Sequence, residues 1–146
     1  MKKIFKVILF SLIASNLYGF SNAVENFFNQ GLELFKEKKY EDARFMFERS
    51  IVFNPKDSNS YLYLAKIYNI EADQKKEEKN LEATLLIEPD NEEAILMSMK
   101  IALEKSNYSK VKDLSNTFTE VCKKFCEENE VILETLANIE PKNNES

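Results

Sequence analysis

The residues of this chain with the most chemistry to offer are two cysteines, Cys122 and Cys126, four positions apart. This spacing places both on one face of a helix, where a bond between them would strain or end that helix. A disulfide at a frayed helix end near residues 127–129 is one interpretation, and two buried or idle thiols are another. A disulfide to another chain, or soft-metal binding with Met97 and Met99, is the third. The spacing is not the Cys-x-x-Cys of thiol oxidoreductases, so redox catalysis has little support.

Missing residue types exclude several other chemistries. The 146 residues include no histidine, so no Ser-His-Asp triad, imidazole zinc site or c-type haem attachment can be built. Two glycines, Gly19 and Gly31, cannot supply a glycine-rich nucleotide-binding loop. Adjacent acidic residues such as Glu77 and Glu78 are better explained as solvent-exposed charges than as a pair of catalytic carboxylates. We therefore expect no enzyme activity, no metal or cofactor, and no small-molecule substrate.

The N-terminal segment has the pattern of a secretion signal. Three lysines near the start precede an apolar run over residues 7–14, which is too short for a comfortable membrane span. Residues 1–23 would be the signal peptide, with cleavage after Gly19 or after Ala23; an uncleaved anchor is the alternative. Because no cysteine precedes Cys122, a lipoprotein anchor is excluded. The expected location is the periplasm.

Charge narrows the class of partner. Cleavage would remove three lysines from the 20 basic residues and none of the 25 acidic ones, which leaves a net charge of −8. Nucleic acids and anionic lipids both favour clustered positive charge. We therefore expect another protein, rather than nucleic acid or a lipid surface, as the partner.

The prolines reveal a repeat. The interval from Pro55 to Pro89 recurs from Asp57 to Asn91, which lie two positions after the prolines and are both good helix caps. This interval, which we call the repeat period, is about 34 residues, and self-similarity at such a period indicates a repeat architecture. Low glycine and proline content favours helices. The sequence therefore predicts an all-α chain of helix-turn-helix units.

Counted from Val24 and from Ser58, these units resemble tetratricopeptide repeats, which have the same period. The first unit carries the Ala-x3-Phe and Pro half of that pattern, and the second carries the aromatic-x2-Leu-small-x2-Tyr half. Small residues are expected where two helices cross, because only small side chains let the backbones approach. The matching residues are Gly31, Ala43, Phe47 and Pro55 in the first unit, and Tyr61, Leu64, Ala65, Tyr68 and Pro89 in the second.

The resemblance implies a right-handed superhelix of about three units and a closing helix with a solvent-facing side. Within a repeat domain over residues 24–139, the units would cover 24–57, 58–91 and 92–125, the closing helix 129–139, and a disordered tail 140–146.

Register decays along the chain. Where the first unit has Ala43, the second has Glu77 and the third has Val111. The third unit also has Lys123 in place of a proline, although helical periodicity continues to Phe125. Asn129 would cap the closing helix. A plain antiparallel helical bundle is the alternative fold.

The resemblance also implies that the first helix of each unit lines a concave groove. The residues at those positions form an apolar strip flanked by lysines, which suits a partner helix or an extended peptide. Phe28 and Leu32 replace the polar residues that clamp a C-terminal carboxylate in chaperone-binding relatives, so that ligand is not expected. Packing inside the fold is the alternative role for these side chains. The groove candidates are Phe28, Leu32, Phe35, Leu62, Lys66, Asn69, Leu96, Lys100 and Leu103.

Taken together, these features predict a non-enzymatic adaptor that is exported to the periplasm and binds a protein partner as an accessory subunit of an envelope machine. One alternative is a small protein that handles thiols or soft metals through Cys122 and Cys126. Another is a structural subunit whose units stack on a second copy or on a larger solenoid.

Overall fold

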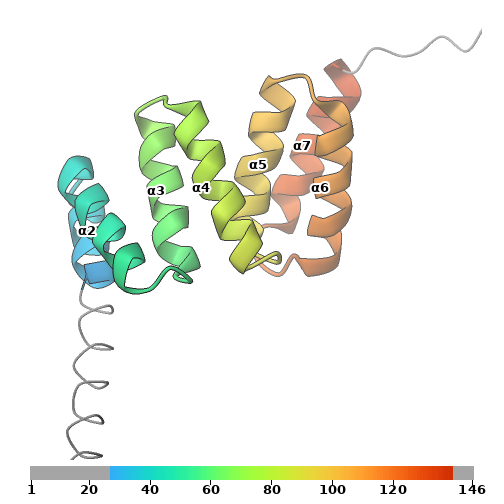
Figure 1. Cartoon of the computed structure of the whole chain (residues 1–146). Coiled ribbons are helices and arrows are strands. Elements are labelled where there is room, and N and C mark those ends of the chain that lie inside the picture. The colour runs from blue at the N-terminus through green and yellow to red at the C-terminus, as the bar shows by residue number, and fades with distance from the viewer. Residues whose placement is uncertain (1–26, 140–146) are drawn as a thin grey trace, which may run out of the picture. The chain divides into compact units, whose positions relative to one another are not determined.

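The computed structural model describes residues 27–139, which form seven helical segments and no strand (Figure 1). The segment expected to be a signal peptide and the expected tail over 140–146 lie outside these residues. The chain divides after Leu64 into two compact structural units, which differ from the repeat units of the sequence. We call them unit 1 (residues 27–64) and unit 2 (residues 65–139). After a helical stretch over residues 27–36, the helices are α2 (Tyr40–Phe53), α3 (Ser58–Ile70), α4 (Gln74–Ile87), α5 (Glu92–Glu104), α6 (Tyr108–Val121) and α7 (Cys126–Ile139).

The helix boundaries follow the repeat period. Helices α3, α5 and α7 begin at Ser58, Glu92 and Cys126, and α2, α4 and α6 follow the same step. Helix α7 is therefore the first helix of a fourth repeat, and it begins three positions before the expected start at 129. Asn129 lies inside α7 and is buried, so its expected role as the helix cap is wrong.

The turn inside each repeat uses the same unusual backbone conformation. Lys38, Ala72 and Ser106, which are again one period apart, have φ values of 61°, 57° and 55°, in the left-handed region. In the second turn, the amide of Asp73 donates to the carbonyl of Tyr68 at 2.9 Å, which closes the loop as in a Schellman motif. The sequence offered no glycine to mark these turns, because L-residues occupy the position that glycine usually takes.

Polar caps hold the turns between successive repeats. In unit 1, Asp57 accepts a hydrogen bond from the buried Ser50 hydroxyl at 2.8 Å and another from the Ser60 hydroxyl. In unit 2, the Asn91 side chain accepts from the Ala94 amide at 3.0 Å at the start of α5. Both residues act as the helix caps that the sequence predicts.

The core of unit 1 forms where α2 crosses the helix over residues 27–36. Ala43 and Phe47 are completely buried, and a Cβ added to Gly31 would lie 2.7 Å from Phe47 Cε1. The Phe47 ring stacks on Tyr63 with ring centroids 5.2 Å apart. Glycine at position 31 is thus required by a close approach, as the repeat pattern implies.

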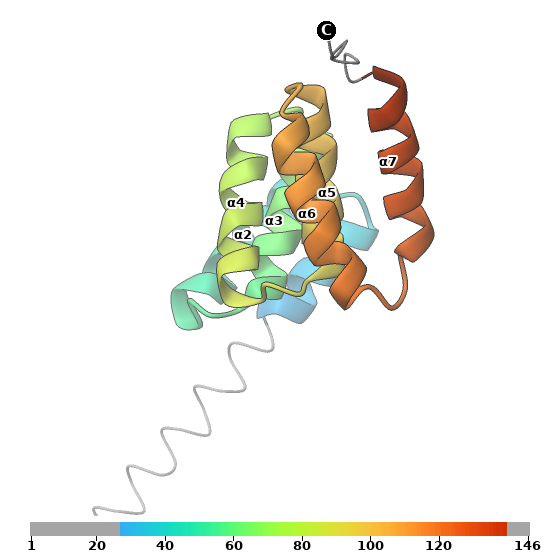
Figure 2. The same cartoon turned by 90° about the vertical axis from the view of Figure 1, so that its right-hand side faces the viewer.

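The core of unit 2 lies among α5, α6 and α7. Met99, Val111 and Phe118 are completely buried there, and α7 adds Ile132 and Leu136. Figures 1 and 2 show α7 as the last helix of this unit, and it packs against both α5 and α6. Among residues 27–139, no helix combines the length and apolar character needed to span a membrane.

Candidate functional site

In unit 1, two of the groove candidates pack against one aromatic ring. Phe28 and Phe35 meet Tyr63 edge-on, with ring centroids 5.8 and 5.1 Å apart, and both phenylalanines are half-buried, as is Leu32. Leu62 is only 5% exposed. Phe28, Leu32 and Phe35 therefore keep accessible apolar surface, whereas Leu62 is a core residue.

In unit 2, the groove candidates are mostly polar at the surface. Lys66 Nζ lies 2.8 Å from the Glu93 carboxylate, and Asn69 is exposed. Lys100 is exposed on α5, and Leu103 is half-buried against the core. These side chains give unit 2 an accessible surface that combines charge with one apolar contact.

Leu96 is the second groove candidate that the structure places in the core. Its side chain is 6% exposed and belongs to the core cluster with Met99 and Phe118. Helix α5 contacts α4, α6 and α7, so much of its circumference is covered. Their burial therefore supports the alternative role of inside packing for Leu62 and Leu96, rather than the groove role.

The repeat signature residues have structural positions. Ala43, Phe47, Leu64, Ala65 and Tyr68 are buried, and Tyr61 is half-buried. Pro55 and Pro89 are exposed in the turns between helices. Packing or a turn position accounts for each of these residues, so none of them has to contact a ligand.

Sequence reasoning missed the burial of Glu77. Its side chain was expected at the solvent surface but is 4% exposed, and its carboxylate accepts a hydrogen bond from Asn69 Nδ2 at 3.0 Å. Burial raises the pKa of Glu77, and the nearby Glu104 and Glu78 charges act in the same direction. The available signal was that Glu77 stands where the first repeat has the small residue Ala43.

The structure joins Cys122 and Cys126 by a disulfide, with Cα atoms 5.4 Å apart. The two residues do not share a helix, since α6 ends at Val121 and α7 begins at Cys126. The expectation that α6 periodicity continues to Phe125 is therefore wrong: the chain leaves the helix, and the bond spans the connection.

Glu92, the first residue of α5, holds the connection that contains the disulfide. Its Oε2 atom accepts hydrogen bonds from the backbone amides of Lys124 at 2.9 Å and Phe125 at 3.2 Å. Bonding to these amides lowers the pKa of Glu92, because they stabilise its ionised form.

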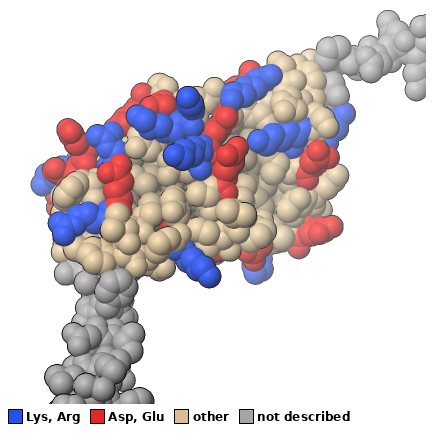
Figure 3. Space-filling view, in the orientation of Figure 1, with Lys and Arg blue, Asp and Glu red and all other residues tan. Residues whose placement is uncertain are grey.

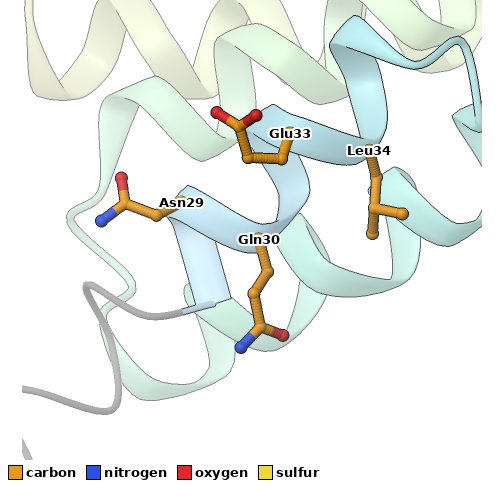
Figure 4. A pocket seen from close by; sticks show the side chains of 4 residues that line it. All are labelled: Asn29, Gln30, Glu33 and Leu34. Atoms are coloured by element: carbon orange, nitrogen blue, oxygen red, sulfur yellow. The ribbon is translucent and has the colours of Figure 1, made fainter.

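The remaining surface features are less specific. Asn29, Gln30, Glu33 and Leu34, all from one helical stretch, line an open hollow of about 450 Å³ (Figure 4). On the face shown in Figure 3, basic and acidic side chains are interspersed. Among residues 27–139, no three acidic or cysteine side chains are grouped so that they could hold a metal ion.

Comparison with solved structures identifies the fold. No protein-family model matches the chain, and no curated protein matches it. Among solved structures, the Arabidopsis OM64 TPR domain is 16% identical, with a TM-score of 0.71 over 82% of this chain and 98% of that one.

Two further similar structures contain bound peptides. The Yersinia enterocolitica type III secretion chaperone SycD, in complex with a peptide of the translocator YopD, is 15% identical, with a TM-score of 0.68 over 80% of this chain and 92% of that one. The first TPR of Spaghetti (RPAP3), bound to the HSP90 peptide SRMEEVD, is also 15% identical, with a TM-score of 0.67 over 80% and 95%. The periodic helix register and these likenesses together establish that the chain has the tetratricopeptide-repeat fold.

Proposed function

We propose that this protein is a non-enzymatic adaptor that binds a helix or an extended peptide of another protein. The main support is the accessible aromatic surface of Phe28 and Phe35 around Tyr63 in unit 1, because half-buried aromatic rings are effective anchors for a peptide ligand. SycD and the first TPR of Spaghetti, which share the fold, are both bound to peptides in their structures.

The polar residues of unit 2 give the proposal a second part. Lys100 is exposed beside the half-buried Leu103, so a partner segment that carries an acidic group next to an apolar side chain would suit this surface. Lys66 already has Glu93 as an ion-pair partner at 2.8 Å, which leaves Lys100 as the better candidate for that acidic group.

Crosslinking in cells tests the adaptor proposal. A tagged Leu32→Ser, Lys100→Glu variant would be compared with wild type, because both positions keep accessible surface whereas Leu62 and Leu96 are needed for folding. We expect capture of one partner to fall roughly tenfold or more, the usual effect of losing an anchor and a charge.

A matched control separates a loss of binding from a general change in the polarity and charge of the surface. Leu86→Ser, Lys79→Glu makes the same chemical changes on α4, where Leu86 is 84% exposed and Lys79 is exposed. This control should retain capture, and circular dichroism should show equal helicity for both variants. Equal capture by both variants would reject the adaptor surface.

We further propose that the protein is exported to the periplasm by residues 1–23 and serves there as an accessory subunit of an envelope machine. The support is the basic start and apolar run of the N-terminal segment, together with the acidic balance of the rest. Intact-mass measurement of the protein from a periplasmic fraction tests this: a mass that begins at Phe20 or Val24 supports export. A full-length mass confined to the cytoplasm would contradict it.

A further inference from the structure

The connection between α6 and α7 is built differently from the equivalent turns. In the two earlier turns between repeats, a proline is followed two positions later by the capping Asp57 or Asn91. At the matching positions, the third connection has Lys123 and Phe125, neither of which can cap a helix with its side chain. The Cys122–Cys126 disulfide spans this connection instead.

The Glu92 carboxylate is the second group that holds the connection between α6 and α7. Its carboxylate accepts from two consecutive backbone amides of the connection, those of Lys124 and Phe125. Because Glu92 is the first residue of α5, these bonds fix the connection to the core helix of unit 2. The α7 start is thus held by a covalent bond and by two charge-assisted hydrogen bonds to one carboxylate.

The body of α7 is less firmly held than its start. Ile132 and Leu136 are its two buried apolar side chains. Asn129 donates to Thr119 Oγ1 at 3.3 Å, but its Oδ1 atom is buried with no hydrogen-bond partner in the described part of the chain. A buried carbonyl without a partner lowers the stability of the α7 contact, so α7 should depend on its fastened start.

We propose that the Cys122–Cys126 disulfide is a redox latch, which holds α7 on α5 and α6 when oxidised and lets α7 detach when reduced. The bond is open to attack, because Cys126 is exposed and Cys122 is half-buried. This proposal is independent of the adaptor function and uses residues outside the groove candidates.

A dithiol of the thioredoxin or dithiothreitol class is the reductant. One of its thiolates attacks Cys126 Sγ, which forms a mixed disulfide and releases Cys122 as a thiolate that takes up a proton. The second thiol of the reductant, as its thiolate, then attacks its own mixed disulfide and releases Cys126, which is also protonated. The protein gains two electrons and two protons, and the reductant becomes a disulfide.

Hydrogen exchange on the full chain, with and without dithiothreitol, tests the latch. Reduction should raise exchange at α7 amides roughly ten- to thirtyfold, the scale expected for opening a short disulfide loop. Amides of α5 and α6 should keep their protection. A Cys122→Ser, Cys126→Ser double variant should match the reduced wild type under both conditions.

Three results would overturn the proposal. Thiol titration of the air-oxidised chain could find two free thiols, in which case no latch exists. Exchange at α7 could be the same in both redox states, so that the bond would hold nothing. Equal loss of protection in α5, α6 and α7 would make the disulfide a staple for all of unit 2 rather than a latch for one helix.

Discussion

A buried carboxylate replaces a small residue at one helix crossing. Glu77 is 4% exposed, and its pKa is raised chiefly by burial, so the folded state favours the protonated form. Its contribution to stability is fully present below its ordinary pKa of 4.5 and is lost as pH rises through the higher folded value. At neutral pH the ionised Glu77 therefore costs stability.

We predict that Glu77→Gln stabilises the protein at pH 7 by about 1 kcal/mol, because glutamine can still accept from Asn69 without carrying a charge. The gain should disappear at pH 4, where wild-type Glu77 is protonated. Urea unfolding of both proteins at the two pH values measures this. An equal difference at both pH values would show that Glu77 titrates normally.

The residues with a left-handed backbone conformation give a second single-residue prediction. Ser106 is exposed with a φ of 55°, a conformation that costs an L-residue free energy and costs glycine little. We expect Ser106→Gly to stabilise the chain by about 0.5 to 1 kcal/mol in thermal or urea unfolding. Ser109→Gly, the same change inside α6, should lower stability by a few tenths instead. Destabilisation by both changes would contradict the strain argument.

At the scale of elements, one capping residue joins two helices. Asp57 bonds the Ser50 hydroxyl of α2 and the Ser60 hydroxyl of α3, and both serines are completely buried. We predict that Asp57→Ala costs about 2 to 3 kcal/mol, since it removes a cap and leaves two buried hydroxyls without this acceptor. Asn91→Ala removes a cap and a single hydrogen bond to the Glu88 carboxylate, leaves no buried hydroxyl without its acceptor, and should cost about 1 kcal/mol. Similar losses in urea unfolding would show that the serine contacts contribute nothing.

Elements were predictable where a repeated residue type marks them. Pro55 and Pro89 gave the repeat period, and Asp57 and Asn91 gave two helix starts that the structure reproduces. The start of α7 at Cys126 also falls on the repeat period, but it was missed because no proline or cap marks the third connection, where a disulfide stands instead. Periodicity gives the position of this helix start but does not reveal the covalent bond beside it.

The candidate site was harder to predict than the fold. Groove positions follow from the repeat register, but burial depends on how many helices cover each one. Leu62 and Leu96 hold equivalent positions in successive repeats, and both turned out to be core residues, whereas Phe28 at the same register position is half-buried. A single sequence gives the register of a helix but not the number of neighbours around it.

At the scale of the whole molecule, α7 is the last described helix and covers the core of unit 2. Ile132 and Leu136 cover the core of unit 2, while most of the other α7 residues are exposed, including four glutamates. Terminal elements with a polar outer side keep repeat proteins soluble. A chain that ends at Val121 should therefore lose roughly 3 to 6 kcal/mol of buried apolar contact and associate through the uncovered α5 and α6 surface.

Sedimentation over a range of concentrations measures that association, with a chain that ends at Ile139 as the control. The control keeps α7 intact and should behave as the full chain does. A Val121-terminated protein that stays at one mass and unfolds like the control would show that α7 is dispensable. The truncated chain also gives the upper limit for association when the redox latch opens. Reduction frees α7 without removing it, so a reduced chain should associate less than the truncated one.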